Sequence, residues 1–190
     1  MAEEKETKKG TENPITEKLL ATRSILISGE INKELSERVV KQMLLLEADN
    51  DEPIKIFIDS PGGDADAGYA IFDMVRFVKP RVIMIGMGLV ASAAALILLA
   101  SPKEDRIGLP NSNYLIHQPL STIRGVATEI EIHAKQIEKL RLKINLLISE
   151  ETGTALEQVG KDTDRDCWLD AKESISYGLI SKIVTSRDDL

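Results

Sequence analysis

The stretch Val82–Ser101, VIMIGMGLVASAAALILLAS, determines how the rest of the sequence is interpreted. It begins with four apolar residues in succession, Val82–Ile85, which are typical of a buried strand, and is expected to turn at Gly86 and Gly88. The seven residues that follow Ser92 are all apolar, and their alanines and leucines favour a helix. The pattern therefore predicts that Ser92 lies where a buried strand passes into a buried helix.

Ser92 is the best candidate nucleophile in the chain. The first turn of a helix has backbone N–H groups without intrahelical acceptors and a partial positive charge, so an oxygen that becomes anionic during a reaction is stabilised there. Serine also caps helices often, and the local sequence does not separate these two roles. A third interpretation, a membrane span over Val82–Ala100, is rejected because glycines and Ser92 interrupt the apolar run.

The composition indicates one globular domain, which we place at residues 18–190. The chain has 190 residues, 43% of them hydrophobic, enough for a single sizeable core. Acidic residues outnumber basic ones by 31 to 24, and the net charge of −7 argues against nucleic acid as a partner. The single cysteine, Cys167, excludes an internal disulfide. Residues 1–17 are polar, offer no apolar run for secretion and are expected to be mobile, so a cytoplasmic protein is predicted.

Short apolar runs alternate with longer helical patterns, which predicts an α/β fold. Strands are expected to start near Ser24, Ile54 and Val82, about 30 residues apart, the size of a βα unit. The carboxyl ends of such strands share one edge of the sheet, so the turns Ser60–Gly63 and Gly88–Ser92 are expected to be neighbours there. Helices are predicted over 32–46, 65–78, 93–99 and 127–150, with a short one near Leu156, and further strands at 114–116 and 179–184.

The helix predicted over 127–150 is longer than a small core needs. Its apolar stripe includes Ile137, Leu140, Ile144 and Ile148, which recur every three or four residues. A helix of this kind can project from the domain and pack against a partner chain, so we expect an oligomer.

A serine nucleophile needs a general base, and the chain has only two histidines. His133 lies in the long predicted helix among charged residues, which favours an exposed, solvated position. His117 ends an apolar strand that faces the same edge as Ser92, and this pairing favours it as the base. The base also needs an orienting carboxylate, and the spacing does not choose among three aspartates of one loop, Asp162, Asp164 and Asp166.

The glycine turn after the second strand supplies a candidate oxyanion site. Without a Cβ atom, the Gly63 N–H can approach a substrate carbonyl and donate to it together with the N–H of Ala93. The sequence shows no metal-ligand spacing and no phosphate-binding loop, so no metal or nucleotide is expected in this chain. Cys167 and Trp168 are interpreted as packing residues.

Several motifs together resemble those of the ClpP family of caseinolytic serine proteases, and the resemblance covers nearly everything from Ser24 to Val184. The motifs are Ser60–Gly63, Gly88–Ser92, Pro110–Ser112, Ile116–Pro119, Ala127–Ala134 and Asp162–Asp166, in the family's order. The resemblance implies a ClpP/crotonase-like spiral of βα units with a projecting long helix.

The resemblance also implies roles for individual residues. By position, Ser92 would be the nucleophile, His117 the general base and Asp166 the residue that orients it, while Gly63 and Ala93 would form the oxyanion hole. Asp164 and Arg165 match the pair of residues through which the family's rings contact each other. They would join two heptameric rings into a tetradecamer. The family implies that an AAA+ unfoldase uses ATP to feed in unfolded polypeptide, and that this chain needs no cofactor of its own.

Some positions depart from the family pattern. Ala93 and Ala94 stand where methionine and glycine usually follow the serine, Ser121 and Thr122 replace paired glycines, and Lys55 replaces an aromatic residue of the ATPase dock. These departures resemble a second, divergent paralogue, so a weakly active structural or regulatory subunit of a mixed ring is the alternative. A third hypothesis is a crotonase-like acyl-CoA hydratase or isomerase. The sequence gives it little support, because neither the turn Ser60–Gly63 nor the turn Gly88–Ser92 contains a glutamate.

Overall fold

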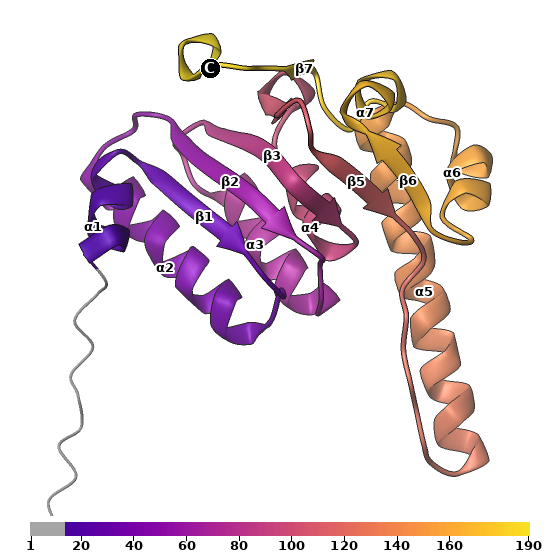
Figure 1. Cartoon of the computed structure of the whole chain (residues 1–190). Helices are drawn as coiled ribbons and strands as arrows, with labels where there is room; N and C mark the ends of the chain where they lie inside the picture. The colour runs from indigo at the N-terminus through magenta and orange to yellow at the C-terminus, as the bar shows by residue number, and fades with distance from the viewer. Residues whose placement is uncertain (1–13) are drawn as a thin grey trace, which may run out of the picture.

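The structure, a computed structural model that describes residues 14–190, is a spiral of βα units around a largely parallel sheet (Figure 1). The predicted α/β fold with βα units is confirmed. The first half consists of α1 (Pro14–Ala21), β1 (Ser24–Ser28), α2 (Lys33–Asp49), β2 (Ile54–Ser60), α3 (Ala65–Phe77), β3 (Val82–Ala91) and α4 (Ala93–Leu98). The second half consists of η1 (Lys103–Asp105), β4 (Arg106–Gly108), β5 (Asn113–Ile116), α5 (Ala127–Thr152), α6 (Leu156–Asp162), β6 (Cys167–Asp170), α7 (Ala171–Tyr177), β7 (Lys182–Ile183) and η2 (Arg187–Asp189).

The strands run in the order β1-β2-β3-β4-β7, and all neighbours in this row are parallel. β3 is long enough to use two partners, because its first half pairs with β4 and its second half pairs with β5. β6 then adds to the far side of β5 in the antiparallel direction. The carboxyl ends of β1, β2, β3 and β5 therefore lie at one edge of the sheet, as the sequence predicts.

Apolar alternation explains which face of the sheet forms the core. In β2, Ile54, Ile56 and Ile58 are fully buried, whereas Lys55 and Phe57 point to the other face and are half-buried. Helices α2, α3 and α4 pack against the buried face, as Figure 1 shows. The fold thus keeps its largest apolar cluster between this sheet and the three helices, among them the one that follows Ser92.

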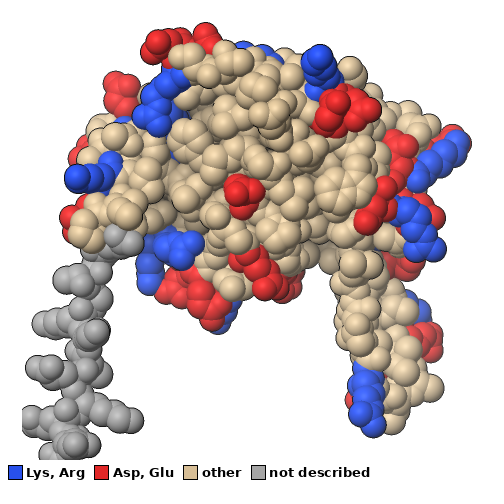
Figure 2. Space-filling model, in the orientation of Figure 1, with Lys and Arg blue, Asp and Glu red and all other residues tan. Residues whose placement is uncertain are grey.

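The long helix is confirmed, and it projects from the domain. α5 extends away from the sheet, with the segment that links it to β5 running alongside (Figure 1). The arm stands clear of the body in the space-filling view (Figure 2). Ile130 and Ile132, near the amino end of this helix, are 43% and 56% exposed, so the arm carries apolar surface that a single chain does not cover.

The prediction of turns at Gly86 and Gly88 is wrong, because β3 continues through both glycines to Ala91. At Gly86 the missing side chain makes room for an aromatic ring: an added Cβ atom would lie 2.5 Å from the Tyr114 hydroxyl oxygen. At Gly88 the chain bulges with φ of +54°, and the Asp59 carboxylate fills the space, accepting a hydrogen bond from the Leu89 N–H at 3.0 Å. Both glycines therefore serve close packing within the strand.

The second half contains elements that the sequence patterns do not predict, namely the strands β4 and β6, the helix α7 and the short helices η1 and η2. The strand expected over 179–184 is only two residues long, because Leu179 and Ile180 are buried in the connection that leads to β7. The segment 1–17 is expected to be mobile, and residues 1–13 of it lie outside the part of the chain that the structure describes. Its last four residues, Pro14–Glu17, belong to helix α1.

Replacing Gly86 by alanine tests the packing of β3. The new methyl group would collide with the Tyr114 ring, which is fully buried, so Gly86→Ala should lower the free energy of unfolding by about 1–3 kcal/mol. Urea unfolding followed by circular dichroism measures the change. Gly160→Ala is the matched control: the nearest atom to its added Cβ would be 3.9 Å away, and alanine favours helix α6, so stability should hold or rise. Equal losses in the two variants would contradict this account.

Candidate active site

Ser92 links β3 to α4 through a strained backbone. Its φ of 56° and ψ of −122° lie in a region that non-glycine residues seldom adopt, and its N–H donates to the Leu115 carbonyl of β5 at 2.8 Å. The Ser92 side chain does not cap α4. The Ser92 hydroxyl therefore does not have the capping role that the sequence left open. Instead, the turn directs this hydroxyl toward the end of β5.

The Ser92 hydroxyl meets His117, which in turn meets an aspartate. His117 Nε2 lies 2.8 Å from Ser92 Oγ, and His117 Nδ1 lies 3.0 Å from Asp166 Oδ1. Strand register explains this geometry, because Ile116 of β5 is paired with Cys167 of β6. One step further along this antiparallel pair, His117 and Asp166 stand opposite each other. The series serine, histidine, aspartate is the arrangement that activates a serine hydroxyl.

The structure separates the three aspartates that spacing alone could not separate. Asp162 accepts a hydrogen bond from the Tyr177 hydroxyl at 2.9 Å, and Asp164 lies 3.3 Å from an Arg141 guanidinium nitrogen. Of these three aspartates, Asp166 is the one whose carboxylate contacts His117, and it is the residue that the family resemblance indicates. The Asp164 and Arg165 side chains are both exposed, so neither is committed to the interior of its own subunit.

The glycine turn after β2 packs directly against the nucleophile. A Cβ atom on Gly62 would lie 2.7 Å from that of Ser92, and one on Gly63 would lie 2.3 Å from the Ile31 carbonyl oxygen. The N–H groups on both sides of Gly63 are used, by the Ser60 hydroxyl and by the Ile31 carbonyl oxygen. The Gly63 N–H remains available at the cavity, and Ala93, as the first residue of α4, has an N–H without an intrahelical acceptor.

A cavity of about 540 Å³ opens beside Ser92 and His117. Leu96 of α4 and Leu140, Ile144 and Ile148 of α5 line it, so its wall is mainly apolar. A pocket of this kind suits an apolar group of a ligand held next to the Ser92 hydroxyl.

The expectation of a solvated His133 is wrong. His133 is half-buried, lines the same cavity and lies 2.7 Å from the Ser121 hydroxyl through its Nε2 atom. Charged neighbours in the sequence suggested a free surface, but the segment 117–126 runs alongside α5 (Figure 1) and places Ser121 against this histidine. Trp168 was also expected to pack, yet it is 56% exposed, whereas Cys167 does pack at the edge of the core.

Sequence reasoning missed the residues that hold the loop before Asp166 in place. The Gln118 N–H donates to the Thr163 carbonyl at 2.7 Å, and the Gln118 side chain donates to the Asp164 carbonyl at 2.5 Å. Thr163 is fully buried and donates from its hydroxyl to Asn145 at 2.8 Å. Asn145 was detectable, because it is a polar residue beside the apolar stripe of α5.

Fold and site together define a serine hydrolase of the α/β class. A family model described as Clp protease matches residues 6–187. The ATP-dependent Clp protease proteolytic subunit 2 of Treponema denticola is 65% identical over 99% of this chain and 94% of its own length. The subunit of the same description from Treponema pallidum is 58% identical over 94% and 90%. A solved ClpP1 mutant from Listeria monocytogenes superposes with a TM-score of 0.86, at 51% identity over 92% of this chain and 98% of its own.

The chain therefore belongs to the Clp protease family and is a serine peptidase subunit of the ClpP type. This assignment removes the crotonase-like hypothesis. No helix among residues 14–190 is long and apolar enough to cross a membrane. Within the same range, no three histidine, cysteine or acidic side chains are grouped to hold a metal ion.

Cys167, the first residue of β6 and the neighbour of Asp166, provides a chemical test of how well this part of the chain is packed. Burial raises the pKa of its thiol, and the charges of Asp162 and Glu173 raise it further. Because the thiolate is the reactive form, iodoacetamide at about pH 8 should alkylate the folded protein several-fold more slowly than the urea-unfolded chain. Raising the pH should speed the reaction of the folded protein. Equal rates for the two states, measured by mass spectrometry, would contradict this packing.

Proposed function

We propose that the chain cleaves peptide bonds through an acyl-enzyme on Ser92, with His117 as general base and Asp166 as the residue that orients it. The observation that carries the proposal is that one imidazole lies within hydrogen-bonding distance of both Ser92 Oγ and Asp166 Oδ1. The strained turn at Ser92 supports the same roles, because strain at an exposed hydroxyl is common at nucleophiles.

The chemistry follows from these contacts. Ser92 Oγ attacks the substrate carbonyl carbon while His117 Nε2 takes its proton, and Asp166 stabilises the imidazolium through Nδ1. The negative oxygen formed in this step accepts hydrogen bonds from the Gly63 and Ala93 N–H groups. His117 then returns the proton to the departing amine as the C–N bond breaks. A water molecule, deprotonated by the same imidazole, then attacks the acyl-enzyme. The bond from the acyl carbon to Ser92 Oγ breaks, the carboxyl product leaves, and the imidazolium returns its proton to Ser92 Oγ.

We propose further that the chain works as two stacked heptameric rings in the cytoplasm. The exposed isoleucines of the α5 arm, Ile130 and Ile132, support contact between rings, with Asp164 and Arg165 as the contact pair. The relatives are described as ATP-dependent, which supports an AAA+ unfoldase as the partner that uses ATP and supplies unfolded polypeptide. The residues proposed for the reaction need no cofactor, metal or nucleic acid.

A second candidate is a weakly active structural or regulatory subunit of a mixed ring with another ClpP paralogue. Two features favour it. Ala93 leaves the floor of the cavity with only a methyl group beside the nucleophile, and Lys55 is half-buried on the outer face of the sheet. Peptide turnover and native mass measured on the same sample separate the candidates: turnover by pure tetradecamers supports the first, and inactive heptamers support the second.

Labelling with a fluorophosphonate tests the nucleophile. The assembled protein should incorporate one probe per subunit at Ser92, because among residues 14–190 this hydroxyl alone is paired with a histidine at a strained turn. Ser92→Ala should abolish labelling, and His117→Ala should slow it by about 10³-fold or more. Ser121→Ala is a matched control, since its hydroxyl also contacts a histidine, and it should label normally. Retained labelling in Ser92→Ala would refute the assignment.

Substitution of the aspartates tests the orienting role. Asp166→Asn should lower kcat for a fluorogenic peptide by about 10³–10⁴-fold, because an amide cannot stabilise the imidazolium. Asp162→Asn leaves the His117 contact intact and should stay within about threefold of the parent. A comparable loss in both variants would indicate damage to the loop instead of a role for Asp166.

A further inference from the structure

One arginine binds the end of α4 that lies opposite the nucleophile. The Arg76 guanidinium, from the last turn of α3, donates from Nε to the Ala100 carbonyl at 3.2 Å and from Nη2 to the Leu99 carbonyl at 3.4 Å. These two carbonyls directly follow α4 and have no further helical turn to donate to them. Ser92 and the Ala93 N–H are at the other end of the same short, fully buried helix, so Arg76 holds the helix that carries them.

Arg76 is itself fixed by an acidic residue of another helix. Its Nη2 atom lies 2.5 Å from Glu151 Oε1, and its guanidinium carbon lies 4.4 Å from the centre of the Phe72 ring. Glu151 belongs to the last turn of α5. The Arg76 guanidinium therefore joins the carboxyl end of α4 to the carboxyl end of α5.

Glu151 is in turn held by a buried arginine. Arg106 is 1% exposed, donates from Nη2 to the Glu151 carbonyl oxygen at 2.9 Å and lies 3.5 Å from its carboxylate. The Arg106 Nε and Nη1 atoms have no partner among the described residues. Burial lowers the pKa of this guanidinium, and Glu151 opposes that shift. Glu151 thus lies between two guanidinium groups, one buried and one at the surface, which restricts where the end of α5 can sit.

The two joined helices are the two sides of the substrate cavity. α4 contributes Ala93 and Leu96, and α5 contributes Leu140, Ile144 and Ile148. A shift of either helix along its axis would change the distance between the apolar wall and the reacting oxygen. Misplacement of reacting groups by about 1 Å is enough to cost up to roughly 10²-fold in rate.

We propose that Arg76 is a positioning residue for the peptidase reaction, which acts through α4 on Ser92 and the Ala93 N–H with Glu151 as its anchor. This inference rests on the proposed function. Arg76 touches neither the cavity nor substrate, so it has no direct part in the chemistry. Its contribution is to fix the nucleophile helix against the helix that forms the opposite wall.

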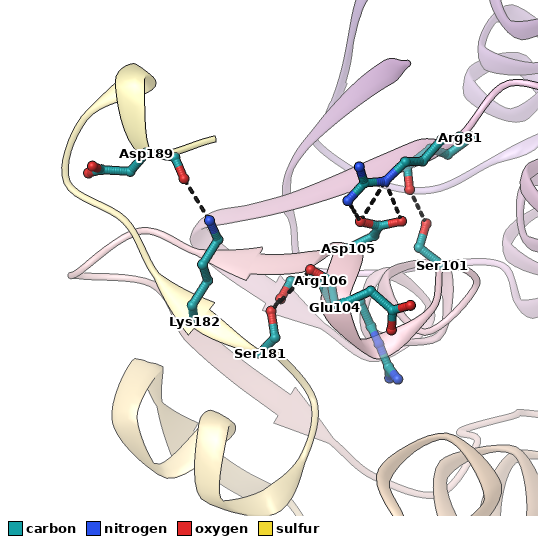
Figure 3. Close-up of polar contacts among 9 residues, drawn as sticks. Arg81, Ser101, Glu104, Asp105, Arg106, Ser181, Lys182 and Asp189 are labelled. Atoms are coloured by element: carbon teal, nitrogen blue, oxygen red, sulfur yellow. Dashed lines mark hydrogen bonds and ion pairs between the residues drawn. The ribbon is translucent and has the colours of Figure 1, made fainter. Parts of the chain in front are cut away.

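A second ion pair nearby offers a matched control. Arg81 binds Asp105 through both Nε and Nη2, and Figure 3 shows this pair close to Ser101, with the Arg106 side chain directed away from it. Like the Arg76 pair, it joins one more exposed side chain to one that is less exposed. It makes no hydrogen bond to the end of α4. Arg81→Gln should therefore affect stability without affecting the geometry of Ser92.

The experiment compares the full-length variants Arg76→Gln, Arg76→Lys and Arg81→Gln with the parent. For each sample we would measure native mass, melting temperature, kcat and KM for a fluorogenic peptide, and the maximal rate of fluorophosphonate labelling. Arg76→Lys retains the charge next to Glu151, but lysine lacks the planar fork that reaches two carbonyls. The Arg76 variants are preferred to Glu151→Gln, which would leave Arg106 buried without its carboxylate partner.

We expect kcat and the maximal labelling rate to fall about tenfold in Arg76→Gln and about threefold in Arg76→Lys, with KM within about twofold of the parent. Arg81→Gln should keep the parent kcat even where its melting temperature falls. The inference is overturned if the Arg76 variants turn over at the parent rate, or if Arg81→Gln loses kcat to the same extent. A parent protein that fails to label at Ser92 would instead refute the proposed function, so the two failures are distinguishable.

Discussion

The site depends on the backbone pairing of β5, which has a different neighbour on each side. Its parallel pairing with β3 brings the turn at Ser92 to the end of β5, and its antiparallel pairing with β6 brings Asp166 opposite His117. The hydrogen bond from the Ser92 N–H to the Leu115 carbonyl joins these two arrangements. A slip of one residue in either register would turn His117 to the other face and separate it from both partners.

The long central strand is what makes this double pairing possible. β3 is ten residues long, and the bulge at Gly88 divides it into a half that lies next to β4 and a half that lies next to β5. The Asp59 carboxylate stabilises the bulge from the neighbouring strand. Packing in the middle of the sheet, at a distance from the reacting atoms, therefore sets the direction in which Ser92 leaves the strand.

Periodicity was sufficient to predict the βα units, the long helix and the serine at a strand end, because each depends on local patterns of apolar residues. The length of β3 was not predictable in this way. Gly86 suggested a turn because the sequence does not show that the Tyr114 ring, 28 residues later, occupies the space where its side chain would lie. The choice of Asp166 likewise depends on register between β5 and β6, which spacing does not encode. His133 was misjudged because the segment that covers it has no regular structure.

The φ of 56° at Ser92 has a consequence for the evolution of the chain. Glycine adopts such a backbone conformation without the steric cost that a Cβ atom imposes, which is about 1–3 kcal/mol for residues in sparsely populated regions. Ser92→Gly would then give a protein that folds more stably and has no nucleophile. Serine at this position lowers the thermodynamic stability of its own subunit, and only selection for the reaction can maintain it there.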